Sequence, residues 1–175
     1  MRTLVVFESA FGNTRKVAEA IAGGLERSGQ VDVVEVGHAT PTLVDGADLL
    51  VLGGLTHAFG MTRPSTREDA ARQGADPGAA GHGGLREWLP ALRDVSPAPA
   101  AAAFDTRVRK VRRLPGSAAR GAAKELRRLG YRLVAEPESF YVEDVRGPLV
   151  QGELERARLW GDRLGALVAP SHQSG

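Results

Sequence analysis

Five short apolar runs alternate with segments of helical periodicity, and this alternation limits the possible folds more than any other feature of the chain. The expected strands are residues 3–7, 31–36, 48–54, 101–104 and 132–142. Uninterrupted apolar runs are typical of strands that are buried on both faces of a parallel sheet. Strands that alternate with helices pair in parallel through right-handed crossovers. The sequence therefore predicts a doubly wound, five-stranded α/β fold with helices on both faces.

Helical segments are expected after four of these strands. An apolar stripe precedes Gly29, further helices are expected over 85–92 and 117–129, and a last helix places four residues inward: Leu154, Ala157, Leu164 and Leu167. Trp88 falls on an apolar stripe, which favours a place in the core. Pro137 interrupts the last strand and favours a sheet edge. Residues 61–84 lack apolar periodicity, so we expect a long loop or a partly helical excursion there.

Length and composition limit the chemistry. A chain of 175 residues with 42% hydrophobic content suits one core, so we expect a single domain over 1–169 and a flexible tail over 170–175. Cysteine is absent, which excludes disulfides, thiol nucleophiles and iron–sulfur ligation by this chain. Redox chemistry would have to come from a bound cofactor. No run approaches a membrane span, and we expect a cytoplasmic protein.

The charge is unevenly distributed. Residues 107–132 contain ten Arg or Lys against one acid, Glu125, so the remainder of the chain is near −7 for a net charge of +2. Such a block can bind nucleic acid, but no aromatic residue is interleaved before Tyr131. We therefore favour a solvated basic face over a nucleic-acid site.

Residues 8–14, between the first strand and the first helix, combine hydroxyls, an amide and a glycine. Together with a helix N-terminus, these groups suit a phosphate dianion. A simpler alternative is that Thr14 caps the helix while Gly12 makes a turn. The chain has no Gly-Lys-Ser/Thr, and this turn has one glycine where a dinucleotide fingerprint has three.

The Ser-Ala-Phe-Gly-Asn-Thr spelling of this loop resembles the phosphate-binding loop of the flavodoxin family. The resemblance implies a flavodoxin-like sheet of order 2-1-3-4-5 and non-covalent FMN as the cofactor. By the same resemblance, the loop would wrap the FMN phosphate with Ser9, Ala10, Phe11, Gly12, Asn13 and Thr14.

Two further loops are implicated by the resemblance. After the third strand, the isoalloxazine ring would be held by Thr56, His57, Ala58, Phe59 and Gly60, with Phe59 stacked on it. The alternative makes Phe59 a core-capping side chain and His57 an ordinary surface histidine. After the fourth strand, the loop with Asp105, Thr106 and Arg107 would close the other side of the flavin, where typical flavodoxins have a tyrosine.

Three functions follow from this resemblance. The first is an FMN-binding electron carrier that works with a redox partner protein, as a monomer or a homodimer. The second is an FMN-dependent NAD(P)H:quinone oxidoreductase, with the 61–84 excursion shaping a substrate pocket. The third is a flavin-free binding module that uses its basic face. No side chain is assigned a catalytic role, because the cofactor would perform the redox chemistry.

Overall fold

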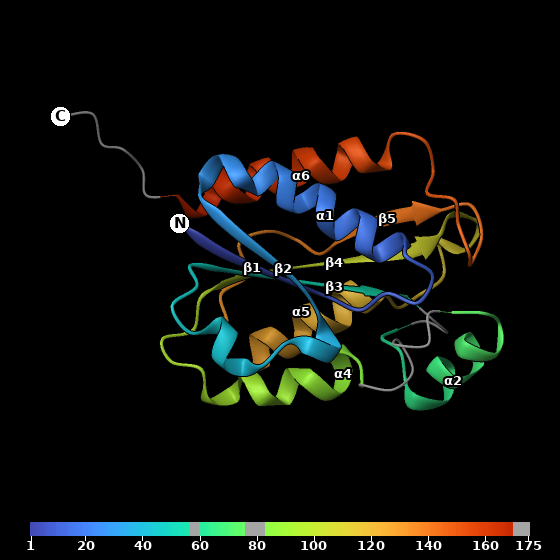
Figure 1. Cartoon of the computed structure of the whole chain (residues 1–175), viewed down its shortest axis with the longest axis horizontal. Coiled ribbons are helices and arrows are strands. Elements are labelled where there is room, and N and C mark those ends of the chain that lie inside the picture. The colour runs from blue at the N-terminus through green and yellow to red at the C-terminus, as the bar shows by residue number, and fades with distance from the viewer. Residues whose placement is uncertain (57–59, 76–82, 170–175) are drawn as a thin grey trace.

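The computed structural model describes residues 1–56, 60–75 and 83–169. Its strands form one parallel sheet of order β2-β1-β3-β4-β5 (Figure 1), which confirms the predicted architecture. Their bounds are Arg2–Phe7 (β1), Gln30–Glu35 (β2), Leu49–Leu55 (β3), Ala100–Val108 (β4) and Glu138–Val142 (β5). The strand order reverses between β1 and β3: β2 lies on one side of β1, and β3, β4 and β5 follow on the other.

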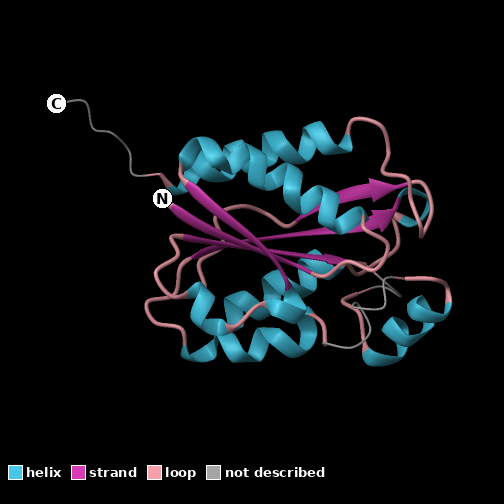
Figure 2. Cartoon of the chain, in the orientation of Figure 1, coloured by secondary structure: helices cyan, strands magenta, loops and turns pink. Residues whose placement is uncertain are grey.

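Helices cover both faces of the sheet (Figure 2). The α-helices are α1 (Asn13–Leu25), α2 (Pro64–Arg72), α4 (Leu85–Trp88), α5 (Ala118–Arg128) and α6 (Glu153–Val168). Short 3-10 helices are η1 (Glu26–Ser28), η2 (Val36–His38), η3 (Pro41–Val44), η4 (Leu89–Asp94) and η5 (Arg109–Val111). Helices α1 and α6 lie side by side on one face, and α4 and α5 lie on the other (Figure 1). None of the described helices is long and apolar enough to cross a membrane.

The two cores follow from the alternation of side chains along the central strands. In β1, Leu4 and Val6 pack toward α4 and α5, whereas Val5 and Phe7 pack toward α1 and α6. Every residue of β1 from Thr3 to Phe7 is buried, as expected for an inner parallel strand. The central strands therefore contribute to both cores, and the carboxyl edge of the sheet is held in a fixed position.

The α1/α6 core contains a group of three aromatic rings. Phe104, Phe140 and Trp160 meet edge to face, with ring centroids 6.0 to 6.3 Å apart. Phe104 also covers Gly53 in the neighbouring strand, where an added Cβ atom would lie 1.9 Å from the ring. Glycine at this position is required by the close approach of that ring.

The end of the chain differs from the sequence expectation in two ways. Strand β5 begins at Glu138 and not at residue 132, because the stretch before Pro137 makes only an isolated bridge between Leu133 and Ala101. In α6, Leu154 and Leu167 are exposed, so the prediction that they face inward was wrong. Trp160 occupies the inward face with Ala157 and Leu164.

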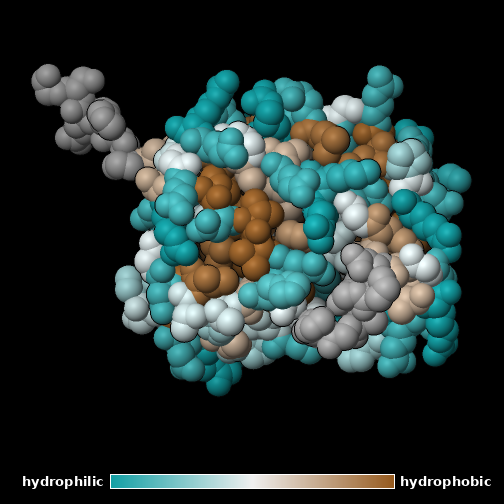
Figure 3. All heavy atoms as spheres, in the orientation of Figure 1, coloured by the Kyte–Doolittle hydropathy of each residue, from teal (hydrophilic) through white to brown (hydrophobic). Residues whose placement is uncertain are grey.

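The two outer strands have different surroundings. Strand β2 is an edge strand whose Val33 is exposed, and Figure 3 shows apolar side chains gathered over it. Strand β5, at the other edge as Pro137 predicted, is followed by a turn that returns antiparallel to it through Val142 and Leu149. Trp88 is half-buried beside the α4/α5 core, as predicted, and donates its indole N–H to the carbonyl of Ala39 at 2.9 Å.

Candidate functional site

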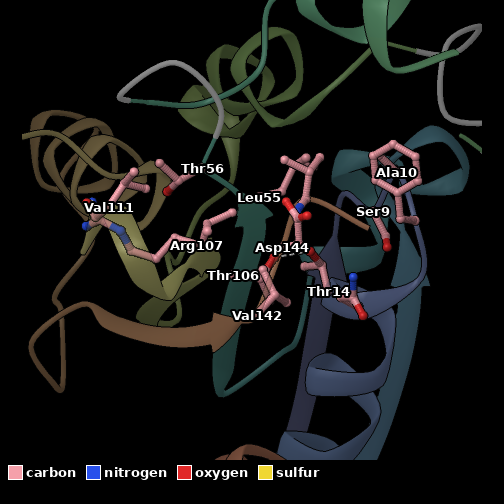
Figure 4. A pocket seen from close by; sticks show the side chains of 14 residues that line it. Ser9, Ala10, Thr14, Leu55, Thr56, Thr106, Arg107, Val111, Val142 and Asp144 are labelled. Carbon is pink, nitrogen blue, oxygen red and sulfur yellow. Dashed lines mark hydrogen bonds between the residues drawn. The ribbon is translucent and has the colours of Figure 1, made fainter. Parts of the chain in front are cut away.

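A cavity of about 380 Å³ opens where the carboxyl ends of β1, β3, β4 and β5 meet (Figure 4). This is the edge of an open α/β sheet at which ligands bind, beside the point where the strand order reverses. Its volume lies within the range of small-molecule and cofactor sites. The lining residues are Ser9, Ala10, Phe11, Asn13, Thr14, Leu55, Thr56, Thr106, Arg107, Val108, Val111, Val142, Asp144 and Val145.

The loop after β1 presents a helix N-terminus without a side-chain cap. Gly12 adopts φ of 88°, a left-handed conformation that glycine accepts at little cost, and its N–H donates to Ser9 Oγ at 3.1 Å. Helix α1 then begins at Asn13, and within the described residues no side chain caps its N-terminus. Thr14 lies inside the helix, so the alternative in which it merely caps α1 is wrong. The free N–H groups of this turn can bind an anion.

Thr14 instead pairs with Thr106 across the sheet. Their hydroxyl oxygens are 2.7 Å apart, and both side chains are buried. In such a pair one hydroxyl donates and the other accepts, and the accepting hydroxyl keeps its own proton. A spare O–H donor therefore lies at the wall of the cavity, next to the N-terminus of α1 (Figure 4).

Strand β4 continues beyond Phe104 to Val108, so the expectation of a loop at Asp105, Thr106 and Arg107 was wrong. These polar residues remain in the strand because each side chain finds a hydrogen-bond partner. Asp105 Oδ2 accepts hydrogen bonds from Thr56 Oγ1 at 2.6 Å and from the Ala119 N–H at 3.1 Å. Asp105 is fully buried and does not line the cavity, so its side chain anchors α5 to the sheet.

Thr56 lines the cavity, but its hydroxyl is already engaged. It donates to Asp105 and accepts from the Ala118 N–H at 2.9 Å. The first turn of α5 is thus capped by Thr56 and Asp105 together with Ser117, whose Oγ accepts from the Arg120 N–H. A ligand could use only the remaining lone pair of the Thr56 hydroxyl.

Arg107 lines the cavity and holds the loop that follows β4. Its side chain is only 7% exposed, and Nη2 donates to the carbonyls of Val111 and Leu114 at 3.1 and 3.2 Å. The chain segment that closes this side of the cavity is therefore 109–116, a few residues later than expected. Figure 4 shows the Arg107 side chain extending toward Val111.

Six lining residues were not predicted from the sequence: Leu55, Val108, Val111, Val142, Asp144 and Val145. Five are aliphatic, so most of this wall suits an apolar ring system. Asp144 and Val145 follow β5, the edge strand. The signal available in the sequence was topological, because the loops after all parallel strands lie at the same edge of the sheet.

The remaining predicted site residues are placed as follows. Gly12 and Gly60 are described but do not line the cavity. His57, Ala58 and Phe59 lie outside the described residues, and stacking of Phe59 on a flavin stays a prediction.

A buried polar network supports the start of the loop after β1. Glu8 is 5% exposed, and its carboxyl group accepts from the Thr62 hydroxyl and from the Leu85 N–H. Arg67 is 7% exposed and donates to Thr62 at 3.1 Å and to Glu87 at 2.9 Å. The excursion after β3, including α2, is thereby fixed to β1 and α4.

Glu87 is the partly exposed member of this network. Burial alone would raise the pKa of Glu87, but hydrogen bonds from Arg67 and from the Gly84 N–H outweigh it and hold the pKa below its ordinary value. The ionised carboxylate is therefore the form that the folded chain prefers.

The flavodoxin family model matches residues 5–79, a span that contains β1, the phosphate loop, β3 and α2. The match covers less than half of the chain, whose fold is flavodoxin-like. The match agrees with the resemblance of residues 9–14 to the flavodoxin phosphate-binding loop and with the observed strand order 2-1-3-4-5. A search of curated proteins found no match to this chain.

Solved structures agree on the fold of this flavodoxin-like chain. An archaeal flavodoxin is 19% identical with a TM-score of 0.65, and the alignment covers 96% of this chain and 99% of that one. A WrbA-like flavodoxin from Agrobacterium tumefaciens is 20% identical with a TM-score of 0.61, covering 95% and 96%. The flavodiiron protein from Giardia intestinalis is 18% identical with a TM-score of 0.67, covering 95% of this chain but 36% of that protein.

Proposed function

We propose that this chain binds FMN non-covalently and carries electrons through it. The observation that carries the proposal is the uncapped N-terminus of α1 beside the Thr14–Thr106 hydroxyl pair, because these are free donors at a site suited to a phosphate dianion. Ser9, Asn13 and Thr14 would hold the phosphate. Bound FMN would supply the redox chemistry, and the chain would supply binding, orientation and exclusion of water.

The aliphatic wall supports a place for the flavin ring. Leu55, Val108 and Val142 line the cavity beside the phosphate loop, and Val111 and Val145 stand at its more exposed side. An apolar wall favours a neutral planar ring over a solvated polar ligand. Arg107 would add a cation near the ring, which would favour an anionic reduced flavin by Coulomb attraction.

The proposal can be tested by titrating the purified chain with FMN and, in parallel, with riboflavin, which has the same ring but no phosphate. We expect FMN to bind about 100-fold more tightly or better, because two charge-assisted hydrogen bonds contribute about 1.5–3 kcal/mol each. Equal affinity for the two ligands would contradict the phosphate site. If neither ligand bound, both the electron-carrier and the oxidoreductase hypotheses would be rejected, and the flavin-free binding module would be favoured.

One observation favours the oxidoreductase alternative. The segment between β3 and α4 carries α2 and packs against the phosphate loop through Ala10, Ala70 and Ala75. An ordered insertion beside a cofactor cavity can shape a second substrate pocket. NAD(P)H oxidation by the FMN-loaded chain with a quinone as acceptor distinguishes the functions, because a carrier would not turn over these substrates without a partner protein.

A further inference from the structure

The loop between β4 and α5 places four cationic side chains at the rim of the cavity. Arg109, Lys110, Arg112 and Arg113 are all exposed. Arg109 pairs with Glu143 at 2.9 Å, whereas the other three form no ion pair within the described part of the chain. Four of the ten cationic side chains of residues 107–132 therefore lie in this one loop. We call these four residues the cationic rim.

Exposed apolar side chains lie beside the cationic rim. Val111 and Leu114, in the same loop, are 40% and 45% exposed, and Val145 from the loop after β5 is 47% exposed. Val111 and Val145 both line the cavity, so this apolar surface is continuous with it. An apolar centre with a charged border is the usual anatomy of a protein–protein interface.

The loop is held in shape before any partner arrives. The two hydrogen bonds from buried Arg107 fix the carbonyls of Val111 and Leu114 from beneath. A preorganised surface loses less conformational entropy on binding. The backbone that carries the rim is therefore held in one arrangement beside the cavity.

We propose that the cationic rim, with Val111, Leu114 and Val145, is the docking surface for an acidic electron-transfer protein. This inference rests on the proposed function, because only a redox cofactor in the cavity gives docking at its mouth a purpose. Charge complementarity selects an acidic partner and speeds its encounter. A nucleic-acid partner is disfavoured because the loop offers aliphatic side chains and no aromatic ring on which a base could stack.

The first test measures docking without any flavin chemistry. The isotope-labelled chain is titrated with acidic cytochrome b5 and, separately, with basic cytochrome c at low ionic strength, and amide chemical shifts are followed. We expect cytochrome b5 to shift the amide signals of residues 109–116 and 144–146. Its affinity should fall as salt is added. The variant R112E/R113E should weaken this binding about 10-fold or more. Shifts spread evenly over the molecule, or none, would overturn the proposal.

A matched control separates local charge from net charge. Arg93 and Arg132 are exposed near the amino edge of the sheet, away from the cavity. Both R112E/R113E and R93E/R132E change the net charge from +2 to −2, because each Arg→Glu substitution removes two charges. R93E/R132E should weaken cytochrome b5 binding by less than about threefold. Equal weakening by the two variants would show that net charge causes the effect, and it would overturn the proposal that the cationic rim is the docking surface.

The second test follows electron transfer in the FMN-loaded chain. The flavin is reduced by dithionite and mixed anaerobically with ferric cytochrome b5, so one electron leaves the flavin and reduces one haem iron. R112E/R113E should slow this reaction about 10-fold at low salt while FMN affinity stays unchanged. Failure to bind FMN would reject the proposed function but leave the docking result standing. Loss of NADPH binding in this variant, with cytochrome b5 binding intact, would assign the rim to nucleotide phosphates and overturn the proposal.

Discussion

The loop after β1 and the loop after β4 border the same cavity, but they are built in opposite ways. In the first, Ser9, Asn13 and Thr14 are buried, and Thr14 is bonded to a residue 92 positions away. In the second, residues 109–115 are exposed, four of the seven are cationic, and the buried guanidinium of Arg107 holds two of their carbonyls. Ligand binding in the first loop is therefore coupled to folding, whereas the second loop can change its charge without disturbing the core.

The largest effect that would test this contrast comes from the hydroxyl pair. We expect T14V/T106V to reduce the preference for FMN over riboflavin by about 10-fold or more in Kd, because one charge-assisted donor, worth about 1.5–3 kcal/mol, disappears while the N–H groups of α1 remain. Its stability should stay close to that of the wild type, since both polar partners are replaced by groups of similar shape. Chemical unfolding and flavin titration of the same samples measure the two quantities.

The single variants T14V and T106V are the controls for that experiment. Each leaves one buried hydroxyl without its partner, which costs about 1–3 kcal/mol of unfolding free energy. Single variants as stable as the double variant would show that the pair is not coupled to folding, and the contrast between the loops would fail.

The next effect concerns the turn into α1. G12A should lower the unfolding free energy by about 1–2 kcal/mol, because alanine is strained at a φ of 88° although no atom lies within 4 Å of the added Cβ. Gly23 is the matched control, since its added Cβ also meets nothing within 4 Å but it lies in the interior of α1. G23A should stabilise the chain by up to about 1 kcal/mol. If both substitutions changed the unfolding free energy in the same direction, strain at position 12 would not explain the effect of G12A.

Acid should weaken the Glu87–Arg67 contact, which belongs to the polar network behind the loop after β1. Because the pKa of Glu87 is lowered in the folded chain, its contribution is present above the unfolded pKa of about 4.3 and is lost as the pH falls through the lower folded value. Unfolding free energy should therefore fall below about pH 4.3, and E87Q should flatten that slope. If the unfolding free energy of E87Q fell with pH as steeply as that of the wild type, other carboxylates would be responsible for the loss of stability in acid.

The smallest expected effect is on the stability of R112E/R113E, and it tests whether the loop after β4 is independent of the core. R112E/R113E should change the unfolding free energy by no more than about 0.5 kcal/mol, as for surface substitutions in general. Thermal or chemical unfolding of this variant beside T14V provides the measurement. A loss as large as that of T14V would show that the rim is tied to the core after all.

The sequence predicts the fold and the first loop well because their signals are local. Strand, glycine-containing turn and helix follow one another within residues 3–25, and the alternation of elements determines the sheet. The end of β4 could not be predicted in this way. Asp105, Thr106 and Arg107 look like loop residues, and only contacts with Thr56, Thr14 and the 111–114 carbonyls explain why they stay in the strand.

The residues after β5 illustrate a different limit. Val142, Asp144 and Val145 enter the cavity because the edge strand ends beside β4, a consequence of register that no short pattern contains. Likewise, nothing in the sequence near Glu8 indicates that Thr62 and Leu85 supply its hydrogen bonds.

The position of Glu8 has a consequence for any attempt to shorten this protein to its sheet and the helices that cover it. Removing residues 61–75 would take away Thr62, which donates to Glu8, and Arg67, whose guanidinium lies 4.0 Å from the same carboxyl group, and would leave only the Leu85 N–H as its partner among the described residues. A buried polar group left without a partner costs about 1–3 kcal/mol. A trimmed design therefore has to replace Glu8 with an apolar residue in the same step, because the carboxyl group after β1 and residues 61–75 depend on each other for hydrogen bonds.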